Sequence, residues 1–168
     1  MHWQEIHGWF QWRTGQEEAV GHFPSGSRFV EVGTYLGRSL GSLGEVVRQS
    51  GKAITVIGVD TCRGSGPEGP RQKDFHGEVV AANGGTFAGV LHRNILECGY
   101  GDLISLVVAD SVTASRFFAD RSLEWVHLDA RHDDRGLRED IAAWLPKLRS
   151  GGWLSGDGSF GVTYGWTQ

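Results

Sequence analysis

The stretch Phe29-Val-Glu-Val-Gly-Thr-Tyr-Leu-Gly-Arg-Ser39 decides the fold of this chain. It begins with a short apolar run rich in β-branched residues, which is typical of a buried strand. Two glycines follow, Gly33 and Gly37, and glycine permits both a tight turn and a close approach of the backbone to a ligand. Apolar residues then recur with the period of a helix. The stretch therefore predicts a buried strand, a glycine turn and a helix.

The same succession of strand and helix recurs along the chain. Further apolar runs make a set of five with the first, at residues 28–32, 54–59, 103–108, 123–128 and 153–154. Helix-period segments lie at residues 40–47, 87–98 and 137–145, the last with Asp134 as its expected N-cap. This alternation predicts an α/β, doubly wound fold, in which about five mostly parallel strands carry helices on both faces.

The composition indicates a single globular domain. The chain has 168 residues, of which 39% are hydrophobic and 21% charged, and this length suffices for one core. No apolar run approaches the ~20 residues of a membrane span, and the first residues lack the pattern of a signal peptide. Only two cysteines are present, so we expect a cytoplasmic protein without membrane association. The net charge of −4 argues against general charge attraction to nucleic acid.

Acidic residues recur at the ends of the predicted strands. In a doubly wound sheet, ligands bind beyond the carboxyl ends of the strands. The five carboxylates at these ends are Glu31, Asp60, Asp110, Asp129 and Asp157. Any one of them alone, Asp110 in particular, could instead cap a helix. Together they predict one ligand site at this edge of the sheet.

The acid within the first strand, Glu31, indicates the charge of the ligand. A phosphate ~4 Å from it would be repelled by about 1 kcal/mol in water and by ~4 kcal/mol at an effective dielectric constant of about 20. An ammonium or sulfonium group would be attracted instead. Asp60 ends the second strand, where an acid commonly binds the hydroxyl groups of a ribose. These two residues favour a positively charged nucleoside over a dinucleotide.

The first 24 residues fall outside the alternation and are rich in aromatic side chains, namely Trp3, Trp9, Phe10, Trp12 and Phe23. One interpretation is that these side chains cover one face of the sheet. The other is that they form a lid or a dimer contact, because three tryptophans within twelve residues exceed what a small cap requires. The sequence Thr14-Gly-Gln-Glu17 matches a capping box and predicts a short helix.

Several segments carry a family pattern, most specifically Val126-His-Leu-Asp-Ala-Arg-His132 and Asp140-Ile-Ala-Ala-Trp-Leu-Pro-Lys-Leu-Arg-Ser-Gly-Gly-Trp-Leu-Ser-Gly-Asp157. Together with residues 29–39, 56–61 and 109–111, they resemble class I S-adenosylmethionine-dependent methyltransferases of the branch with Asp-x-x-His after the fourth strand. The resemblance covers residues 28–158. It implies a Rossmann-like fold, S-adenosylmethionine as cofactor and S-adenosylhomocysteine as product. We expect a single domain, 1–168, with residues 1–24 as a cap on the core at 28–158.

The resemblance also implies a role for each residue at the strand ends. The implied cofactor-binding residues, from the methionine end to the adenine, are Glu31, Gly33, Thr34, Tyr35, Gly37, Ser39, Asp129, Asp60, Thr61, Asp110 and Ser111. Glu31 would contact the ammonium group of the methionine part directly or through water. Asp129 would lie near the transferred methyl group, and Asp60 would bind the ribose hydroxyls. Asp110 and Ser111 would border the adenine.

The expected reaction is O-methylation of a small molecule. Methyl transfer depends mainly on alignment of the reacting atoms. A base is needed to remove a proton only if the acceptor group is weakly acidic. His132 is the candidate base, because an imidazole has an unperturbed pKa near 6.5 and accepts a proton at neutral pH. It could instead only hydrogen-bond the backbone where a helix begins. We expect catalytic roles for His132 and Asp129.

A divalent metal ion such as Mg²⁺ is a further hypothesis. Asp129 and Asp157 end strands that we expect to lie about 4.8 Å apart, and they could share an ion that lowers the pKa of an acceptor hydroxyl. Related metal-dependent methyltransferases have a second acid at the next position, where this chain has Gly158. A metal site at these two aspartates would therefore lack one ligand.

Ten residues follow Gly158, fewer than the helix and hairpin that usually end class I methyltransferases. We therefore expect five strands without the C-terminal hairpin. The last strand would form an edge carrying Trp153 and Leu154, which favours cover by the aromatic N-terminus or by a homodimer.

Three alternatives to a small-molecule methyltransferase stay open. The short C-terminus fits a non-catalytic module that binds S-adenosylmethionine. A nicotinamide-dependent oxidoreductase shares the glycine turn and the acid after the second strand, but gives Glu31 no role. A methyltransferase acting on nucleic acid could contact phosphates through Arg63, Arg71 and Lys73, although the Asn/Asp-Pro-Pro-aromatic motif of amino-group methylation is missing.

Overall fold

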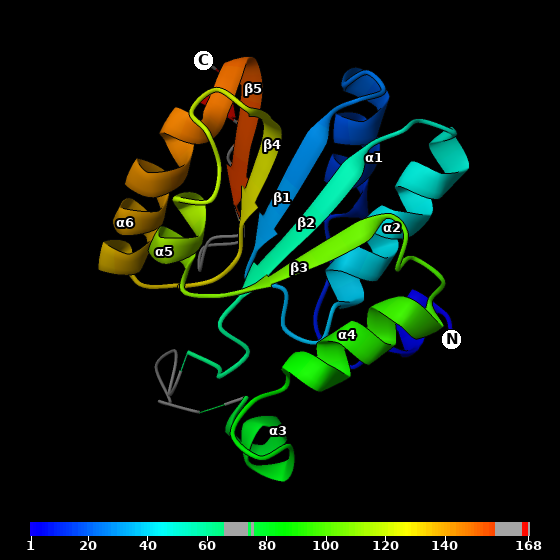
Figure 1. Cartoon of the computed structure of the whole chain (residues 1–168), viewed down its shortest axis with the longest axis vertical. Coiled ribbons are helices and arrows are strands. Elements are labelled where there is room, and N and C mark those ends of the chain that lie inside the picture. Colours follow the sequence, from blue (N-terminus) through cyan, green and yellow to red (C-terminus); the bar gives the residue numbers. More distant parts are fainter. Residues whose placement is uncertain (66–73, 75, 157–165, 168) are drawn as a thin grey trace.

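The computed structural model of the chain describes residues 1–65, 74, 76–156 and 166–167. Its centre is one sheet with the strand order β3-β2-β1-β4-β5-β6, of which Figure 1 labels β1 to β5. The five parallel strands are β1 (Arg28–Val32), β2 (Thr55–Asp60), β3 (Ile104–Val108), β4 (Leu123–Leu128) and β5 (Leu148–Gly156). The two-residue β6 (Trp166–Thr167) runs antiparallel to β5. β1 and β4 lie side by side where the order reverses, which is the place where doubly wound sheets bind ligands.

Helices cover both faces of the sheet (Figure 1). One face carries α1 (Arg13–His22), α2 (Arg38–Ser50) and α4 (Ala88–Glu97). The other face carries α5 (Ser111–Ser115) and α6 (Asp134–Trp144). The remaining short helices are η1 (Trp3–Glu5), α3 (Gly77–Ala82) and η2 (Leu145–Lys147).

Two apolar cores lie under these helices, one on each face of the sheet. Phe29 and Trp125 belong to the core under α1, α2 and α4, whereas Val30 and Val126 belong to the core under α5 and α6. This division follows from the strand itself, because successive side chains point to opposite faces. The predicted α/β, doubly wound, Rossmann-like fold is confirmed, and the bounds of β1 and β4 are those predicted from the sequence.

The last parallel strand is not the open edge that the sequence suggested. β6 pairs with Trp153 and Leu154 of β5, so the sheet has one short strand more than the five expected. The aromatic N-terminus contributes as well, because the ring of His22 stacks on Trp153 with centroids 4.5 Å apart. An exposed β5 edge was one reason to expect a homodimer, and the pairing with β6 removes that reason. A dimer contact through the N-terminal aromatic residues stays a prediction.

The starts of two helices differ from their predictions. α1 has Trp12 as its N-cap, so Thr14 lies inside the helix and the predicted capping box is wrong. The N-cap of α6 is Asp133, whose carboxylate accepts a hydrogen bond from the backbone N–H of Gly136 at 2.8 Å. The sequence analysis had placed this cap one residue later, at Asp134. Both helices exist as predicted, and only the residue that satisfies the first turn differs.

The N-terminal aromatic residues divide into two groups. Trp3 and Phe23 are buried in the core under α1, α2 and α4. Phe23 packs on Phe29 of β1 and Trp153 of β5, which confirms for it the interpretation that it covers the sheet, whereas Trp3 packs on α2 and donates a hydrogen bond to Glu45. Trp9 is 63% exposed and therefore contributes little to that core. Within the described ranges, no helix has the length and apolar character required to cross a bilayer.

Candidate functional site

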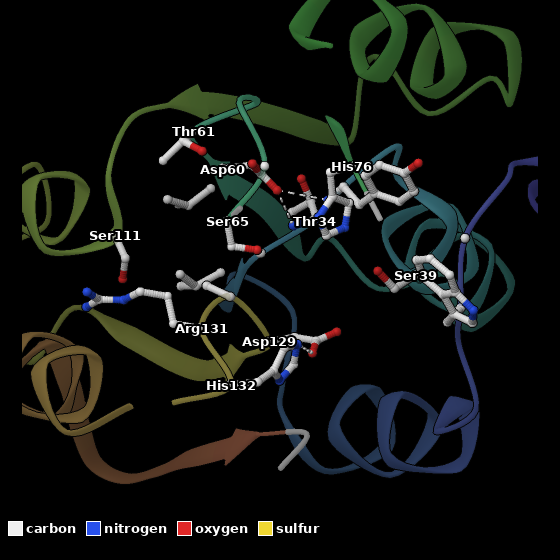
Figure 2. A pocket seen from close by; sticks show the side chains of 18 of the residues that line it. Thr34, Ser39, Asp60, Thr61, Ser65, His76, Ser111, Asp129, Arg131 and His132 are labelled. Carbon is white, nitrogen blue, oxygen red and sulfur yellow. Dashed lines mark hydrogen bonds and ion pairs between the residues drawn. The ribbon is translucent and has the colours of Figure 1, made fainter. Parts of the chain in front are cut away.

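A cavity of about 840 Å³ lies at the carboxyl ends of the parallel strands (Figure 2). The predicted site residues that line it are Gly33, Thr34, Tyr35, Ser39, Asp60, Thr61, Asp110, Ser111, Asp129 and His132. The fold thus gathers residues from four strand ends around one space. Glu31 and Gly37 do not line the cavity, and Asp157 lies outside the described residues.

The two glycines after β1 are required by packing against the protein itself. Gly33 has a φ of +90°, and a Cβ at this position would lie 2.1 Å from the backbone oxygen of Asp129. Gly37, the N-cap of α2, has a φ of +91°, and its Cβ would lie 2.9 Å from Leu91 of α4. Both positions combine a left-handed backbone with a close neighbour, and only glycine meets both conditions without strain. The close approach expected toward a ligand is therefore made toward β4 and α4.

Asp60, at the end of β2, holds the turn that follows β1. Its Oδ2 accepts hydrogen bonds from the backbone N–H groups of Thr34 at 2.8 Å and Tyr35 at 2.9 Å, the former drawn in Figure 2. Its Oδ1 accepts from the N–H of Cys62 at 2.7 Å. An ionised carboxylate offers about four lone-pair sites, so one site on Oδ1 is left for a ligand hydroxyl. Asp60 therefore shapes the cavity as well as lining it.

Glu31 is buried behind the cavity wall and is only 2% exposed. Its Oε1 accepts a hydrogen bond from the hydroxyl of Ser39, and Ser39 lines the cavity. Its Oε2 has no hydrogen-bond partner among the described residues. Burial is the main reason that the pKa of Glu31 rises from 4.5 to about 8, and the charges of Asp129 and Asp60 add to it. Glu31 is therefore neutral at pH 7 while it lacks a cationic partner.

His127 is a neighbour of Glu31 that the sequence analysis missed. It lies opposite Glu31 in the register of β1 and β4, with its Nδ1 2.9 Å from the hydroxyl of Ser155. The same hydroxyl accepts from Nε1 of Trp125 at 2.9 Å. Burial lowers the pKa of His127 from 6.5 to about 3, so the ring is neutral. The ring of Trp12 stacks on it with centroids 3.6 Å apart.

A signal for His127 was present in the sequence. It is a polar residue inside the apolar run 123–128, and such a residue is fully buried only with a partner. Its Nε2 nonetheless has none among the described residues. Two neighbouring strands thus each place one unpartnered polar atom on the same face of the sheet, on Glu31 and on His127.

A polar network borders the cavity on the side of Ser111. Arg131 forms ion pairs with Glu139 at 2.9 Å and with Asp140, which is 1% exposed, at 3.2 Å. Ser111 accepts a hydrogen bond from Nε1 of Trp144 at 2.9 Å. Figure 2 shows Arg131 reaching toward Ser111. These bonds link the α5 and α6 side of the molecule to the cavity, and nothing in the sequence spacing had indicated Arg131.

Asp110 both caps α5 and lines the cavity. Its carboxylate accepts a hydrogen bond from the N–H of Thr113 at 3.2 Å. The alternative that Asp110 caps a helix is therefore confirmed, and it does not displace the residue from the cavity wall.

Asp129 and His132 lie together after β4 (Figure 2). Nε2 of His132 is 3.8 Å from Oδ1 of Asp129, which is longer than a hydrogen bond. Both side chains line the cavity, as a base and a methyl-orienting acid would have to. Among the described residues, no group of three or more His, Cys, Asp or Glu side chains could hold a metal ion. Because Asp157 lies outside those residues, metal binding by Asp129 and Asp157 stays a prediction.

The cavity is lined by more aspartates than arginines, and two histidines, His76 and His132, line it as well. Four aspartates line its described part, Asp60, Asp110, Asp129 and Asp133. The two arginines that line it are bonded to protein oxygens. Arg38 donates to the carbonyl of Ile6 at 3.0 Å, and Arg131 is held by the two carboxylates of α6. This balance favours a cationic ligand over a phosphate.

The sequence of residues 30–158 matches a family described as "Methyltransferase domain". The chain belongs to this family. The match confirms the resemblance to class I S-adenosylmethionine-dependent methyltransferases, since it spans the whole series of strands from β1 to β5. No curated protein matches the chain.

Solved structures with the same fold include several methyltransferases. An S-adenosylmethionine-dependent O-methyltransferase from Thermotoga maritima has a TM-score of 0.57 and 14% identity over 89% of this chain and 45% of its own. A putative rRNA-methylase from Clostridium thermocellum has a TM-score of 0.56 and 11% identity, and the alignment covers 89% of this chain and 72% of the methylase. A putative caffeoyl-CoA O-methyltransferase from Staphylococcus aureus has a TM-score of 0.54 and 10% identity, and the alignment covers 92% of this chain and 60% of that enzyme. The methyltransferase domain therefore spans about half the length of the Thermotoga enzyme.

Proposed function

We propose that this methyltransferase domain binds S-adenosylmethionine in the cavity at the strand ends and transfers its methyl group to an oxygen of a small molecule. The observation that carries the proposal is the buried Glu31. Its Oε2 has no hydrogen-bond partner among the described residues, and Ser39, which donates to its Oε1, lines the cavity. A carboxyl group in this position is stabilised by a cation and not by a phosphate. The O-methyltransferases among the similar structures support the choice of oxygen.

The residues present fit this cofactor. A cavity of about 840 Å³ falls within the range that holds ligands of this size. Glu31 and the turn from Gly33 to Ser39 would hold the methionine end, and the last lone-pair site of Asp60 would accept from a ribose hydroxyl. Asp110 and Ser111 would border the adenine. Each of these positions offers an acceptor or a small backbone surface.

The chemistry requires alignment and the removal of one proton. S-adenosylmethionine, when bound, supplies a methyl group on a positively charged sulfur, which leaves as the neutral thioether of S-adenosylhomocysteine. Asp129 would keep negative charge near the methyl group and orient the acceptor. His132 would take the proton of the acceptor hydroxyl as its oxygen gains the methyl group. The exposure of both side chains to the cavity supports these roles.

Calorimetry with S-adenosylmethionine, S-adenosylhomocysteine and NAD tests the cofactor. We expect both sulfur ligands to bind and NAD not to bind. Glu31→Gln should lower the affinity for S-adenosylhomocysteine by roughly 10- to 150-fold, which corresponds to the loss of one hydrogen bond to a charged group. Glu18→Gln, at an exposed position on α1, is the matched control. Tight NAD binding, or equal affinity in Glu31→Gln, would refute the proposal.

The ribose contact needs a separate test, because Asp60 also holds the turn after β1. Loss of affinity in Asp60→Ala could come from the lost backbone hydrogen bonds alone. A comparison of S-adenosylhomocysteine with its 2′-deoxy analogue, in wild type and in Asp60→Asn, separates the two effects. If Asp60 binds the ribose, removal of the hydroxyl weakens binding in wild type and changes little in the variant.

Methyl transfer is then measured by mass spectrometry over a panel of small hydroxylated acceptors and a structured RNA, with Mg²⁺ or with a chelator. Methylation of a small molecule supports the proposal, and His132→Ala should slow it by about 10²- to 10⁴-fold. Methylation of the RNA alone would support the nucleic-acid alternative, to which the putative rRNA-methylase gives weight. Cofactor binding without any transfer would support a non-catalytic module.

A further inference from the structure

The segment from Gly8 to Trp12 forms part of the cavity wall. All five of its residues line the cavity. Near one end, Trp9 stacks on Tyr35 in the turn after β1, with ring centroids 6.1 Å apart and planes inclined by 22°. At the other end, Trp12 stacks on His127 of β4. The segment therefore bridges the ends of β1 and β4 and is anchored at both by aromatic rings.

The two tryptophans of this segment differ in what they contribute to the fold. Trp12 packs edge to face on the buried Trp125 and stacks on the buried His127, so its ring belongs to the structure of the sheet face. Trp9 is 63% exposed, and its ring adds little to the core. An exposed apolar ring indicates a binding surface where it belongs to a larger patch, so its neighbours in the cavity decide its meaning.

Trp9 belongs to an aromatic wall, which we define as Trp9, Tyr35 and His76. The ring of His76 lies 4.6 Å from Tyr35 and 6.5 Å from Trp9, in both cases steeply inclined. Phe87 supports Tyr35 from behind at 5.4 Å, edge to face. All of these residues line the cavity. The wall is thus a preformed surface of π-systems and not a single exposed ring.

We propose that the aromatic wall binds the methyl acceptor, and that this acceptor carries a planar aromatic ring. The inference rests on the proposed function and names the class of its second substrate. The acids at the strand ends would account for the ammonium and hydroxyl groups of the cofactor. Tyr35 also belongs to the turn that would hold the methionine end, whereas Trp9 and His76 have no role in the proposed cofactor site. Flat rings stack on such side chains with a gain that a saturated ring of the same size does not obtain.

The position of the wall supports an acceptor that enters and leaves. Figure 2 shows His76 and the pair of Asp129 and His132 on different sides of the cavity. In the proposed arrangement, a ring stacked on the wall directs a hydroxyl substituent across the cavity toward Asp129 and His132. Because Trp9 is largely exposed, a molecule bound against it reaches solvent without any rearrangement of the strand ends.

The test uses 2-naphthol and its fully saturated analogue, decahydro-2-naphthol, as matched probes. Their binding to wild-type protein saturated with S-adenosylhomocysteine is measured by NMR, with the indole N–H of Trp9 as a local reporter. The variants are Trp9→Leu, which removes the ring, and Trp9→Phe, which keeps a smaller one. Phe117→Leu is the control, because Phe117 is similarly exposed at 68% but does not line the cavity. The affinity of each variant for S-adenosylhomocysteine and S-adenosylmethionine is measured in parallel.

We expect 2-naphthol to bind more tightly than its saturated analogue and to shift the Trp9 resonance. Trp9→Leu should lower the affinity for 2-naphthol by roughly 2- to 12-fold, which is the range expected for one aromatic pair. Trp9→Phe and Phe117→Leu should change this affinity little. Equal binding of the two probes, no binding of 2-naphthol, or no effect of Trp9→Leu would overturn the inference and leave the proposed function intact. Trp9→Leu could instead lower the affinity for S-adenosylmethionine and leave the affinity for S-adenosylhomocysteine unchanged. This result would show that the wall binds the sulfonium group, and it would also overturn the inference. If S-adenosylhomocysteine does not bind to wild type, the proposed function itself fails.

Discussion

Replacement of Glu31 by glutamine should change how the stability of the ligand-free protein depends on pH. The pKa of Glu31 is about 8 in the folded protein, compared with an ordinary value of 4.5. The folded state therefore retains a proton that the unfolded state has lost, and the free energy of unfolding falls by ~1.4 kcal/mol per pH unit between these values. The contribution is fully present below pH 4.5 and is lost as the pH rises through 8. From pH 6 to pH 8, we expect the loss to be about 2 kcal/mol.

Glutamine does not titrate, and its side-chain oxygen can still accept a hydrogen bond from Ser39. The free energy of unfolding of Glu31→Gln should therefore not show the decrease that the titration of Glu31 causes between pH 6 and pH 8. Urea unfolding at pH 6 and pH 8 gives the two free energies for each protein. The difference between wild type and variant cancels every other group that titrates in this range. Glu18→Gln, with an exposed side chain, should behave as wild type. If wild type and Glu31→Gln lose the same stability between pH 6 and pH 8, Glu31 is ionised in the free protein and the reasoning is wrong.

Other substitutions test the remaining features of the site. The pKa of His127 is lowered from 6.5 to about 3 by burial, so its contribution to stability is present above pH 6.5 and is lost as the pH falls. His127→Phe keeps a ring for stacking but does not titrate. Between pH 6 and pH 4, its free energy of unfolding, measured with urea, should therefore fall by ~2 kcal/mol less than that of the wild type. Gly33→Ala should destabilise by about 3 kcal/mol or more, because its Cβ meets the backbone of Asp129 at a positive φ. Gly21→Ala, in α1 with nothing within 4 Å of the added Cβ, should stabilise by ~0.5–1 kcal/mol in the same assay. Burial raises the pKa of the Cys62 thiol to about 12, so iodoacetamide at pH 8 should modify it only after unfolding, as peptide mapping by mass spectrometry can show.

The fold could be predicted from the sequence because its signals are local and repeated. Apolar runs and helix periods predicted the order of the five parallel strands and of α2, α4 and α6, and the acids at the strand ends were gathered by the topology alone. The short helices α3 and α5 were not predicted, because they have too few residues for a helical period. Cap positions were less certain, since Asp133 and Asp134 are chemically equivalent candidates and only the path of the chain decides between them. β6 could not be predicted, because two residues carry no periodic pattern.

The parts of the site that sequence reasoning missed depend on contacts between distant segments. Arg131 lies next to predicted residues, but its partners Glu139 and Asp140 become relevant only once α6 has turned back over the sheet. The aromatic N-terminus was conspicuous in the sequence, yet nothing indicated that Trp12 would stack on His127 across more than a hundred residues. Spacing along the chain does not determine such contacts, because they form only when α1 and α6 pack on the sheet.

Glu31 and His127 each have one buried polar atom without a hydrogen-bond partner in the described part of the chain, and these atoms connect the stability of the free protein to its proposed ligand. A buried polar atom without a hydrogen bond costs about 1–3 kcal/mol, and both atoms lie on neighbouring strands of the same sheet face. A cation that reaches Glu31 would ionise it, so ligand binding at pH 7 should release close to one proton, measurable by calorimetry in buffers of different ionisation enthalpy. Glu31→Gln should then be more stable than wild type at pH 8 and yet bind S-adenosylhomocysteine less tightly without proton release. A carboxyl group that served packing alone would change the stability and leave the affinity as it was.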